Sequence, residues 1–211
     1  MELKNKRIVF LGDSITEGYG TSSEEKTFHQ LLKEKYQLSL ASNCGVGGTR
    51  IARQINPSYA IPRHDLYFRL RATVMPKDAD IVIVFGGTND SGHGDAPFGD
   101  IDSTDDYTFN GALNNLIKQL KQDYPNSKII FLTPIHRLWE NECMNNSGYI
   151  LKDYVNAIIA ATKRHNIALI DLFNELELDP HDETLVPDGL HPNDSGHKIL
   201  ADFIGKKLIM M

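Results

Sequence analysis

The sequence is poor in the features that mark several protein classes. Its 211 residues contain only two cysteines, Cys44 and Cys143. Two cysteines without a metal-ligand or redox spacing favour free thiols in a reducing compartment. Internal repeats, low-complexity tracts and linker-like stretches are also absent from the sequence. We therefore expect residues 1–211 to form one domain.

Long hydrophobic runs and clusters of basic residues are missing too. The first apolar run covers only residues 8–11, which is too short for the apolar region of a signal peptide or for a membrane span. The formal net charge is -6, whereas nucleic acids and anionic membranes bind surfaces with basic patches. We expect a cytoplasmic protein that neither binds nucleic acid nor inserts into a membrane. The oligomeric state cannot be read from the sequence.

Five apolar runs alternate with amphipathic segments along the chain. The runs predict strands over residues 8–11, 38–43, 79–85, 128–132 and 167–171. The amphipathic segments predict helices over residues 25–36, within 56–76, and over 113–120, 150–159 and 199–208. Strands separated by helices favour a three-layer α/β/α fold with a mainly parallel, five-stranded sheet, for which we expect the flavodoxin-like order 2-1-3-4-5.

Two segments between these elements are less regular. Within 56–76, three prolines accompany an apolar run of Leu66, Phe68, Leu70 and Val74. This pattern predicts a short helix over the sheet, with most of its arginines in solvent. Residues 91–106 are rich in Gly and Asp, and we expect a loop at the rim of the site.

Polar residues follow two of the predicted strands. Ser14 comes after the first strand and Asn89 after the third. Because ligands of open α/β sheets bind beyond the carboxyl ends of the strands, near the switch point, both residues are predicted to face one crevice. Each also has an ordinary structural interpretation, since serine is a common helix cap and asparagine a common turn residue.

An aspartate and a histidine lie three residues apart near the end of the chain, in the sequence Asp188-Gly189-Leu190-His191. A tight turn at Gly189 allows the carboxylate to reach one ring nitrogen of His191. The other nitrogen is then free to accept a proton. This arrangement is typical of a general base with its orienting partner, which needs a nucleophile such as Ser14.

Four sequence blocks span nearly the whole chain: Gly12-Asp-Ser-Ile15, Asn43-Cys-Gly-Val-Gly-Gly48, Gly86-Gly-Thr-Asn-Asp90 and Asp188-Gly-Leu-His191. Together and in this order they resemble the GDSL, or SGNH, family of serine esterases and acylhydrolases. Ile15 replaces the leucine of the family name with a side chain of similar volume. The resemblance implies a nucleophile at Ser14, a base at His191 supported by Asp188, and oxyanion donors at Gly48 and Asn89. The backbone amide of Ser14, at the start of a helix, is a further donor suited to negative charge.

The resemblance implies hydrolysis of a carboxylic ester through an acyl-enzyme, with a small-molecule ester as partner and no cofactor. The family covers lipid acyl esters, short-chain esters and acetylated sugars. Because the chain lacks a long apolar lid, we favour a short acyl group such as acetyl on a carbohydrate, with lysophospholipase-like cleavage of lipids as the alternative. The candidates for the substrate pocket are Asp13, Phe98, His136 and Trp139, although core or loop packing fits the two aromatic residues equally well.

Two other classes stay open. Asp13, Asp90, His93 and His191 could suggest a metal-dependent phosphoesterase, but the sequence has neither an early D-x-H ligand pair nor a late histidine cluster. We expect His93 and Asp95 to hold their loop by hydrogen bonds rather than to bind a metal. The second alternative is a binding module that has lost turnover, against which the complete set of Ser, His, Asp and Asn argues.

Overall fold

The computed structural model describes residues 1–58, 60–145 and 147–211. At its centre is a parallel sheet with the strand order β2-β1-β3-β4-β5. The strands are β1 (Arg7–Gly12), β2 (Leu40–Gly45), β3 (Ile81–Phe85), β4 (Lys128–Leu132) and β5 (Ala168–Ile170). This confirms the predicted α/β fold and strand order.

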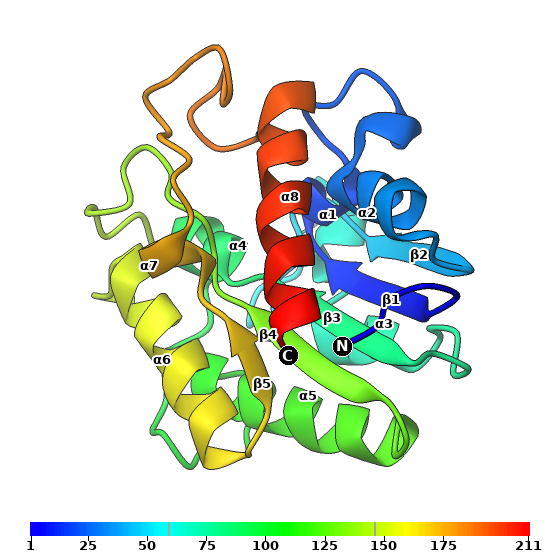
Figure 1. The fold of residues 1–211 in the computed structure, drawn as a ribbon. Coiled ribbons are helices and arrows are strands. Elements are labelled where there is room, and N and C mark those ends of the chain that lie inside the picture. The colour runs from blue at the N-terminus through cyan, green and yellow to red at the C-terminus, as the bar shows by residue number, and fades with distance from the viewer. Residues whose placement is uncertain (59, 146) are drawn as a thin grey trace.

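The helices form one layer on each side of the sheet. They are α1 (Ser14–Glu17), α2 (Phe28–Tyr36), α3 (Phe68–Ala72), α4 (Thr88–His93), α5 (Phe109–Asp123), α6 (Leu151–Arg164), α7 (Leu172–Glu175) and α8 (Asp194–Met210), with the 3-10 turns η1 (Glu24–Lys26) and η2 (Pro62–Asp65). Figure 1 shows α8 in front of the sheet, with α2 beside it and α5 on the other side. In the described ranges, no helix is long and apolar enough to cross a membrane.

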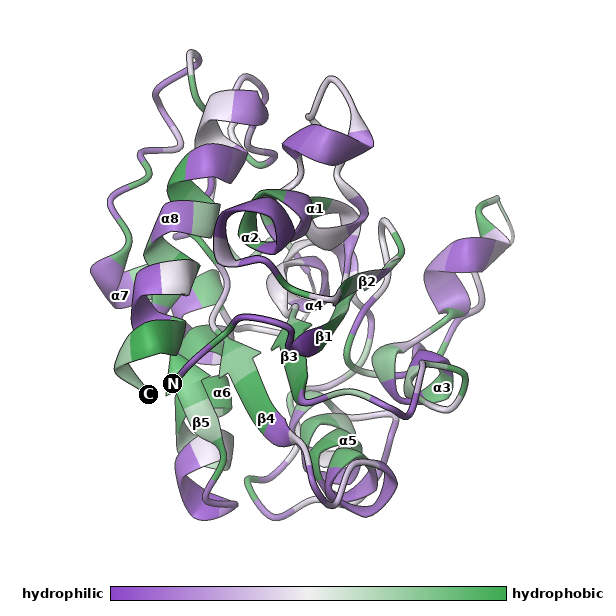
Figure 2. Cartoon of the chain, turned by 45° about the vertical axis from the view of Figure 1, so that its right-hand side comes forward, coloured by the Kyte–Doolittle hydropathy of each residue, from purple (hydrophilic) through white to green (hydrophobic). Residues whose placement is uncertain are grey.

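The core consists of two apolar clusters separated by the sheet. Successive residues of a strand point to opposite faces, and β3 shows the result. Ile81, Ile83 and Phe85 pack with α2 and α8, while Val82 and Val84 pack with α3, α5 and α6. All five side chains are buried, as expected for a central strand covered on both sides. In Figure 2 the strands are accordingly green and the outer sides of the helices are mostly purple.

Most predicted elements are present, with shifted ends. The fourth strand covers 128–132 as predicted, whereas the second lies at 40–45, two residues later than expected. The first predicted helix is divided into η1 and α2. The last helix begins at Asp194, five residues before the predicted start, and the side chain of Asn193 caps it.

The predicted apolar side of the helix within 56–76 is wrong. Leu66, Leu70 and Val74 are 40%, 45% and 84% exposed, whereas Phe68 and Ala72 are fully buried. The physical reason is helical phase: residues three and four positions after Phe68 share its face, and residues two positions away lie on the opposite side. The alternating run from 66 to 74 therefore could not form one face of a helix.

The predicted loop over 91–106 starts too early. Its first three residues belong to α4, which runs from Thr88 to His93. A helix can begin here because β3 ends at Phe85 and Gly87 takes a left-handed conformation at the N-cap. Asn89 therefore lies in the first turn of a helix and not in an irregular turn.

Four strands direct the chain to the carboxyl edge of the sheet. Ser14 follows β1, Gly48 follows β2 and Asn89 follows β3, while residues 133–142 continue from β4. Because β1 lies between β2 and β3, the segments after these three strands meet around Ser14, at the switch point of the sheet.

Candidate active site

Ser14 is the first residue of α1, directly after β1. Asp13 caps this short helix, since its Oδ1 accepts a hydrogen bond of 3.1 Å from the amide of Ile15. Ser14 as a residue is 9% exposed. Its amide has no carbonyl or side-chain acceptor among the hydrogen bonds of the described residues, so it remains available as a donor at the helix start.

Ser14, His191 and Asp188 form a continuous hydrogen-bonded row. The Oγ atom of Ser14 lies 2.9 Å from Nε2 of His191, and Nδ1 of His191 lies 2.7 Å from Oδ2 of Asp188. A carboxylate accepts only, so the proton of a neutral His191 is on Nδ1 and its Nε2 lone pair faces Ser14. In this tautomer the hydroxyl of Ser14 donates to the ring.

A tight turn presents Asp188 to the histidine. Its Oδ1 accepts from the amides of Leu190 and His191, at 3.0 and 2.7 Å. Partial burial acts to raise the pKa of Asp188, but the hydrogen bonds from the His191 ring and from these two amides outweigh it and lower the pKa. The carboxylate therefore stays ionised beside the imidazole.

Gly189 in this turn has a φ of 73°, in the left-handed region. A Cβ there would lie 2.2 Å from a methyl carbon of Leu138, and the amide of Leu138 donates to the carbonyl of Gly189 at 2.8 Å. The segment after β4 thus supports the turn that carries Asp188 and His191. On the solvent side, the ring of Tyr19 lies 4.4 Å from that of His191, measured between centroids.

The loop after β2 passes beside Ser14. A Cβ on Gly47 would lie 3.4 Å from that of Ser14, and the amide of Gly47 donates to Glu17 at 2.8 Å. Gly48 has a φ of 74°, and a Cβ on it would lie 2.1 Å from Nε2 of His64. Both conformation and close packing therefore require glycine at this position.

Asn89 joins this loop from the other side. Its Nδ2 donates to the carbonyl of Thr49 at 3.0 Å, and its Oδ1 lies 3.1 Å from Nε2 of His93. Because Thr49 follows Gly48 directly, the structure brings the two predicted oxyanion residues together, although they come from different strands.

Two charged residues that sequence reasoning missed hold this arrangement. Asp90 accepts from the amides of Ile51 and Ala52, at 3.0 and 2.9 Å, and burial raises its pKa to about 6. Its position beside Asn89 in a buried turn was the available sequence signal.

Arg71, expected in solvent with its neighbouring arginines, is only 7% exposed. It donates to the carbonyl of Cys44 at 2.6 Å and to Oγ1 of Thr49 at 2.8 Å. The sequence offered no signal for this role, because both partners are more than 20 residues away and one is a backbone carbonyl.

The four predicted pocket residues do not share one pocket. Asp13 is 1% exposed beneath Ser14, and burial raises its pKa to about 7. A side chain so buried cannot contact a substrate in this structure, so that expectation is wrong for Asp13. Phe98 stacks on Tyr149, with ring centroids 4.0 Å apart. It lines a cavity of about 770 Å³ that does not include His136 or Trp139.

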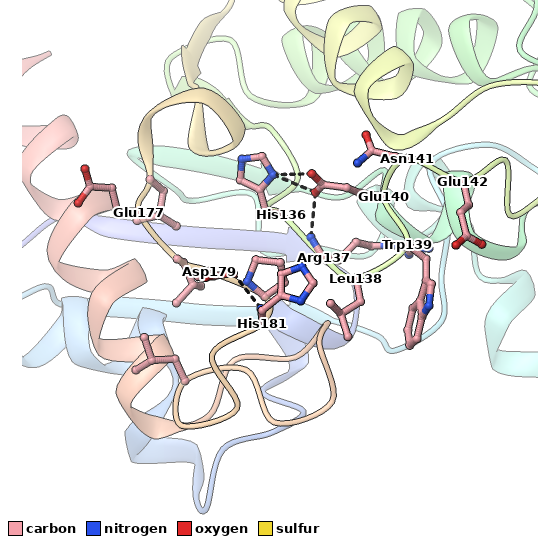
Figure 3. A pocket seen from close by; sticks show the side chains of 14 residues that line it. His136, Arg137, Leu138, Trp139, Glu140, Asn141, Glu142, Glu177, Asp179 and His181 are labelled. Atoms are coloured by element: carbon pink, nitrogen blue, oxygen red, sulfur yellow. Dashed lines mark hydrogen bonds and ion pairs between the residues drawn. The ribbon is translucent and has the colours of Figure 1, made fainter.

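His136 and Trp139 line a cavity of about 790 Å³ together with residues 176–181. Figure 3 shows the loop that follows β4 on one side of this cavity and the segment with Asp179 and His181 on the other. Nδ1 of His136 pairs with Glu140 at 2.9 Å. Trp139 is 54% exposed and has a φ of 59°, a conformation that costs energy for a residue with a Cβ.

His93 and Asp95 both form hydrogen bonds with neighbouring segments, as expected. His93 contacts Asn89 and Arg50, and Asp95 accepts from the amides of Ile55 and Asn56, both at 2.7 Å. Across residues 1–58, 60–145 and 147–211, no group of three or more His, Cys, Asp or Glu side chains is arranged to hold a metal ion.

Comparison with known proteins adds relatives of known structure. No curated protein is significantly similar to the chain. A Lactobacillus plantarum protein of known structure is 28% identical, with a TM-score of 0.83 and 98% of each chain covered. An acetyl xylan esterase is 25% identical, with a TM-score of 0.67, covering 95% of this chain and 98% of its own. The lipase/acylhydrolase from Enterococcus faecalis, 21% identical with a TM-score of 0.67 over 96% and 95% of the two chains, shares the fold.

The sequence profile of the GDSL-like lipase/acylhydrolase family matches residues 10–199. This range includes every block that carries the resemblance, from Ser14 to His191. Since the match covers most of the chain, and the hydrogen-bonded serine, histidine and aspartate lie where such a fold binds its ligands, the chain belongs to the GDSL-like lipase/acylhydrolase family.

Proposed function

We propose that the protein is a serine esterase that cleaves carboxylic esters of short acyl groups through an acyl-enzyme. The observation that carries this proposal is the 2.9 Å contact between Oγ of Ser14 and Nε2 of His191, with Asp188 on the opposite ring nitrogen. A hydroxyl within hydrogen-bond reach of a base that a third group orients is the arrangement of an activated nucleophile.

In the first half of the reaction, the proton of the Ser14 hydroxyl moves to Nε2 of His191 while Oγ attacks the ester carbonyl carbon. The carbonyl electron pair moves onto its oxygen and forms a tetrahedral oxyanion. When the oxyanion collapses, the bond to the alcohol oxygen breaks, and His191 returns the proton to that oxygen. Asp188 stabilises the imidazolium that exists between these two transfers.

The oxyanion is held by the backbone amides of Ser14 and Gly48 and the side-chain amide of Asn89. Donors of this kind are effective because they are already in place when the charge develops. In the second half, a water molecule gives a proton to His191 and its oxygen attacks the acyl carbon. Collapse of this second oxyanion releases the acid, and Oγ of Ser14 recovers its proton from His191.

For the substrate, we favour an acetyl or other short acyl ester of a carbohydrate. The likeness to an acetyl xylan esterase supports this choice, as does the cavity beside Trp139. An exposed indole can pack against the apolar face of a sugar ring, and carboxylate and imidazole groups such as Glu140 and His181 can bind its hydroxyls. The left-handed backbone conformation of Trp139 supports a role of its ring in binding, because such strained conformations cluster at functional sites.

The first test is hydrolysis of p-nitrophenyl esters from acetyl to palmitoyl by the wild type and Ser14→Ala. We expect activity on short chains that the substitution abolishes. Activity that peaks on long chains would favour lipid acyl esters instead. Undiminished hydrolysis by Ser14→Ala would contradict the serine mechanism, and inactivity of the wild type on every ester would favour a binding module.

The sugar is tested with Trp139→Ala and Trp139→Phe on acetylated xylo-oligosaccharides and on p-nitrophenyl acetate. Loss of the ring should raise KM for the oligosaccharide, and phenylalanine should restore part of the affinity, while p-nitrophenyl acetate is cleaved as before. Equal effects on both substrates would contradict a sugar subsite.

The two free cysteines fit a reducing compartment, and we propose that residues 1–211 act there, in the cytoplasm, as one domain.

A further inference from the structure

We propose that His93 is a positioning residue that fixes the side-chain amide of Asn89 as an oxyanion donor, and that Arg50 selects the tautomer in which His93 does so. This inference rests on the proposed function, because it gives a role to a neighbour of one proposed donor. It concerns three side chains in a row, Arg50, His93 and Asn89, which we call the Arg50 row.

The direction of the hydrogen bonds in the Arg50 row follows from its first member. Nη1 of Arg50 lies 3.0 Å from Nδ1 of His93. A guanidinium can only donate, so Nδ1 of His93 must accept. In a neutral imidazole the proton is then on Nε2, and Nε2 donates to Oδ1 of Asn89 over 3.1 Å.

His93 stays neutral at pH 7. Lost hydration around the ring and the charge of Arg50 lower the pKa of His93 to about 4. A protonated ring would direct an N–H at the guanidinium, so the contact with Arg50 itself opposes protonation. The side chain nevertheless lies at the surface, since His93 as a residue is exposed. Its replacement should therefore remove a hydrogen bond rather than a part of the core.

The consequence for Asn89 is a single amide orientation. Its Oδ1 faces the N–H of His93, and its Nδ2 donates to the carbonyl of Thr49 at 3.0 Å. A flipped amide would set N–H against N–H and oxygen against oxygen, and it would lose both bonds. The second hydrogen of Nδ2 has no acceptor among the hydrogen bonds of the described residues, which leaves it for a bound oxyanion.

The Arg50 row is itself anchored to the loop after β2. Arg50 is 5% exposed and also donates through Nη2 to the carbonyl of His64 at 3.1 Å. The next two amides of the loop, of Ile51 and Ala52, donate to Asp90. His93 follows Asn89 by four positions on α4, which places both on one helix face. The loop that carries Gly48 and the helix that carries Asn89 are thus joined by side chains with a defined polarity.

The test compares His93→Leu, which removes the donor, with His93→Gln, whose amide N–H can replace Nε2. With p-nitrophenyl acetate we expect His93→Leu to lower kcat by about 10- to 100-fold, less than the loss of a donor itself, with KM unchanged. His93→Gln should recover a large part of kcat. In an Asn89→Ala background, His93→Leu should have no further effect, because the group that it positions is gone.

Thermal unfolding of both His93 variants checks that they fold. If His93→Leu lowers kcat equally with and without Asn89, or raises KM instead, His93 does not act through Asn89 and the inference is overturned. Ser14→Ala and Asn89→Ala in the same series report on the proposed function: if both lose activity while His93→Leu retains full kcat, only the positioning role fails.

Discussion

The two sides of Ser14 are built differently. On one side, the oxyanion side, residues 47–52 and 88–93 are buried at their key positions, with Asn89 and Asp90 5% and 4% exposed. On the other, the base side, Asp188 and His191 lie in a surface turn, where the side chain of Asp188 is 49% exposed. The oxyanion side is held by side chains from distant segments. The base side is held mainly by its own turn and by Leu138.

This difference matches what each side has to do in the proposed reaction. Donors to an oxyanion contribute most when they need no rearrangement, so a buried network with defined polarity suits them. A general base has to exchange a proton with the leaving alcohol and then with water, so access to solvent suits it. The comparison predicts that substitutions on the base side disturb protonation, whereas substitutions on the oxyanion side disturb geometry.

The largest effect is expected from Asp188→Asn on the base side. The remaining amide oxygen would still accept from the backbone of Leu190 and His191, which turns the new NH₂ group toward Nδ1 of His191. His191 would then carry its proton on Nε2 and could not accept one from Ser14. We expect a loss in kcat of about 1,000- to 10,000-fold with little change in KM, measured with p-nitrophenyl acetate.

A matched control for this substitution is Asp182→Asn, since the side chain of Asp182 accepts from Thr184 in a similar surface turn and has no hydrogen bond to the proposed site among the described residues. It should retain wild-type activity. Comparable activity of the two variants would mean that Asp188 does not select the tautomer of His191.

On the oxyanion side, Asn89→Ala should lower kcat by about 100- to 1,000-fold, the usual cost of one lost donor. The protein should remain folded, because among the described residues the Asn89 side chain makes only two hydrogen bonds, to Thr49 and from His93. Steady-state kinetics with circular dichroism of the same sample provide the measurement. A kcat within threefold of the wild type would remove Asn89 from the oxyanion hole.

A smaller effect, again on the base side, is expected from Gly189→Ala. The added methyl group would collide with Leu138 and move the turn that carries Asp188 and His191. We expect kcat to fall by about tenfold, in line with the sensitivity of catalysis to small displacements. Gly148→Ala is the control: Gly148 also has a positive φ, of 82°, but no atom of the described residues lies within 4 Å of its added Cβ. It should lose only the stability that the positive φ costs an alanine, and no activity.

The smallest effect concerns stability at a site away from the reaction. His197 is fully buried in α8, its Nδ1 accepts from the amide of Phe28 at 3.0 Å, and burial lowers its pKa to about 4. In the unfolded chain it takes up a proton near pH 6.5, so acidification from about 6.5 to 4 favours unfolding. Over this window the contribution of the neutral ring to stability is progressively lost.

His197→Asn keeps an acceptor for Phe28 but does not titrate. Urea unfolding of the wild type and of this variant at pH 7 and 4.5 should show the gap between their unfolding free energies shrink by about 2 kcal/mol at the lower pH. A gap that stays constant would mean that His197 is protonated in the folded protein. Activity at pH 7 should be the same in both, since the ring lies outside the two compared sides.

The elements that could be predicted are those whose pattern is local. The strand over 128–132 is an uninterrupted apolar run, and any buried parallel strand shows the same pattern. The buried face of the helix within 56–76 could not be predicted, because it depends on where the helix starts, and packing of Phe68 against the sheet decides that. The start of α4 depends likewise on the left-handed conformation of Gly87 after β3.

The site divides in the same way. The sequence by itself determined the parallel α/β architecture, through its alternating strands and helices, and the nearness of Asp188 to His191, which needs only a turn of four residues. Only the tertiary structure decided which groups orient Asn89 and Gly48, because Arg50 and Arg71 donate to partners more than 20 residues away in the chain, one of them a backbone carbonyl. Such contacts leave no pattern in the chain, since their energy depends on geometry that exists only when the whole sheet has formed.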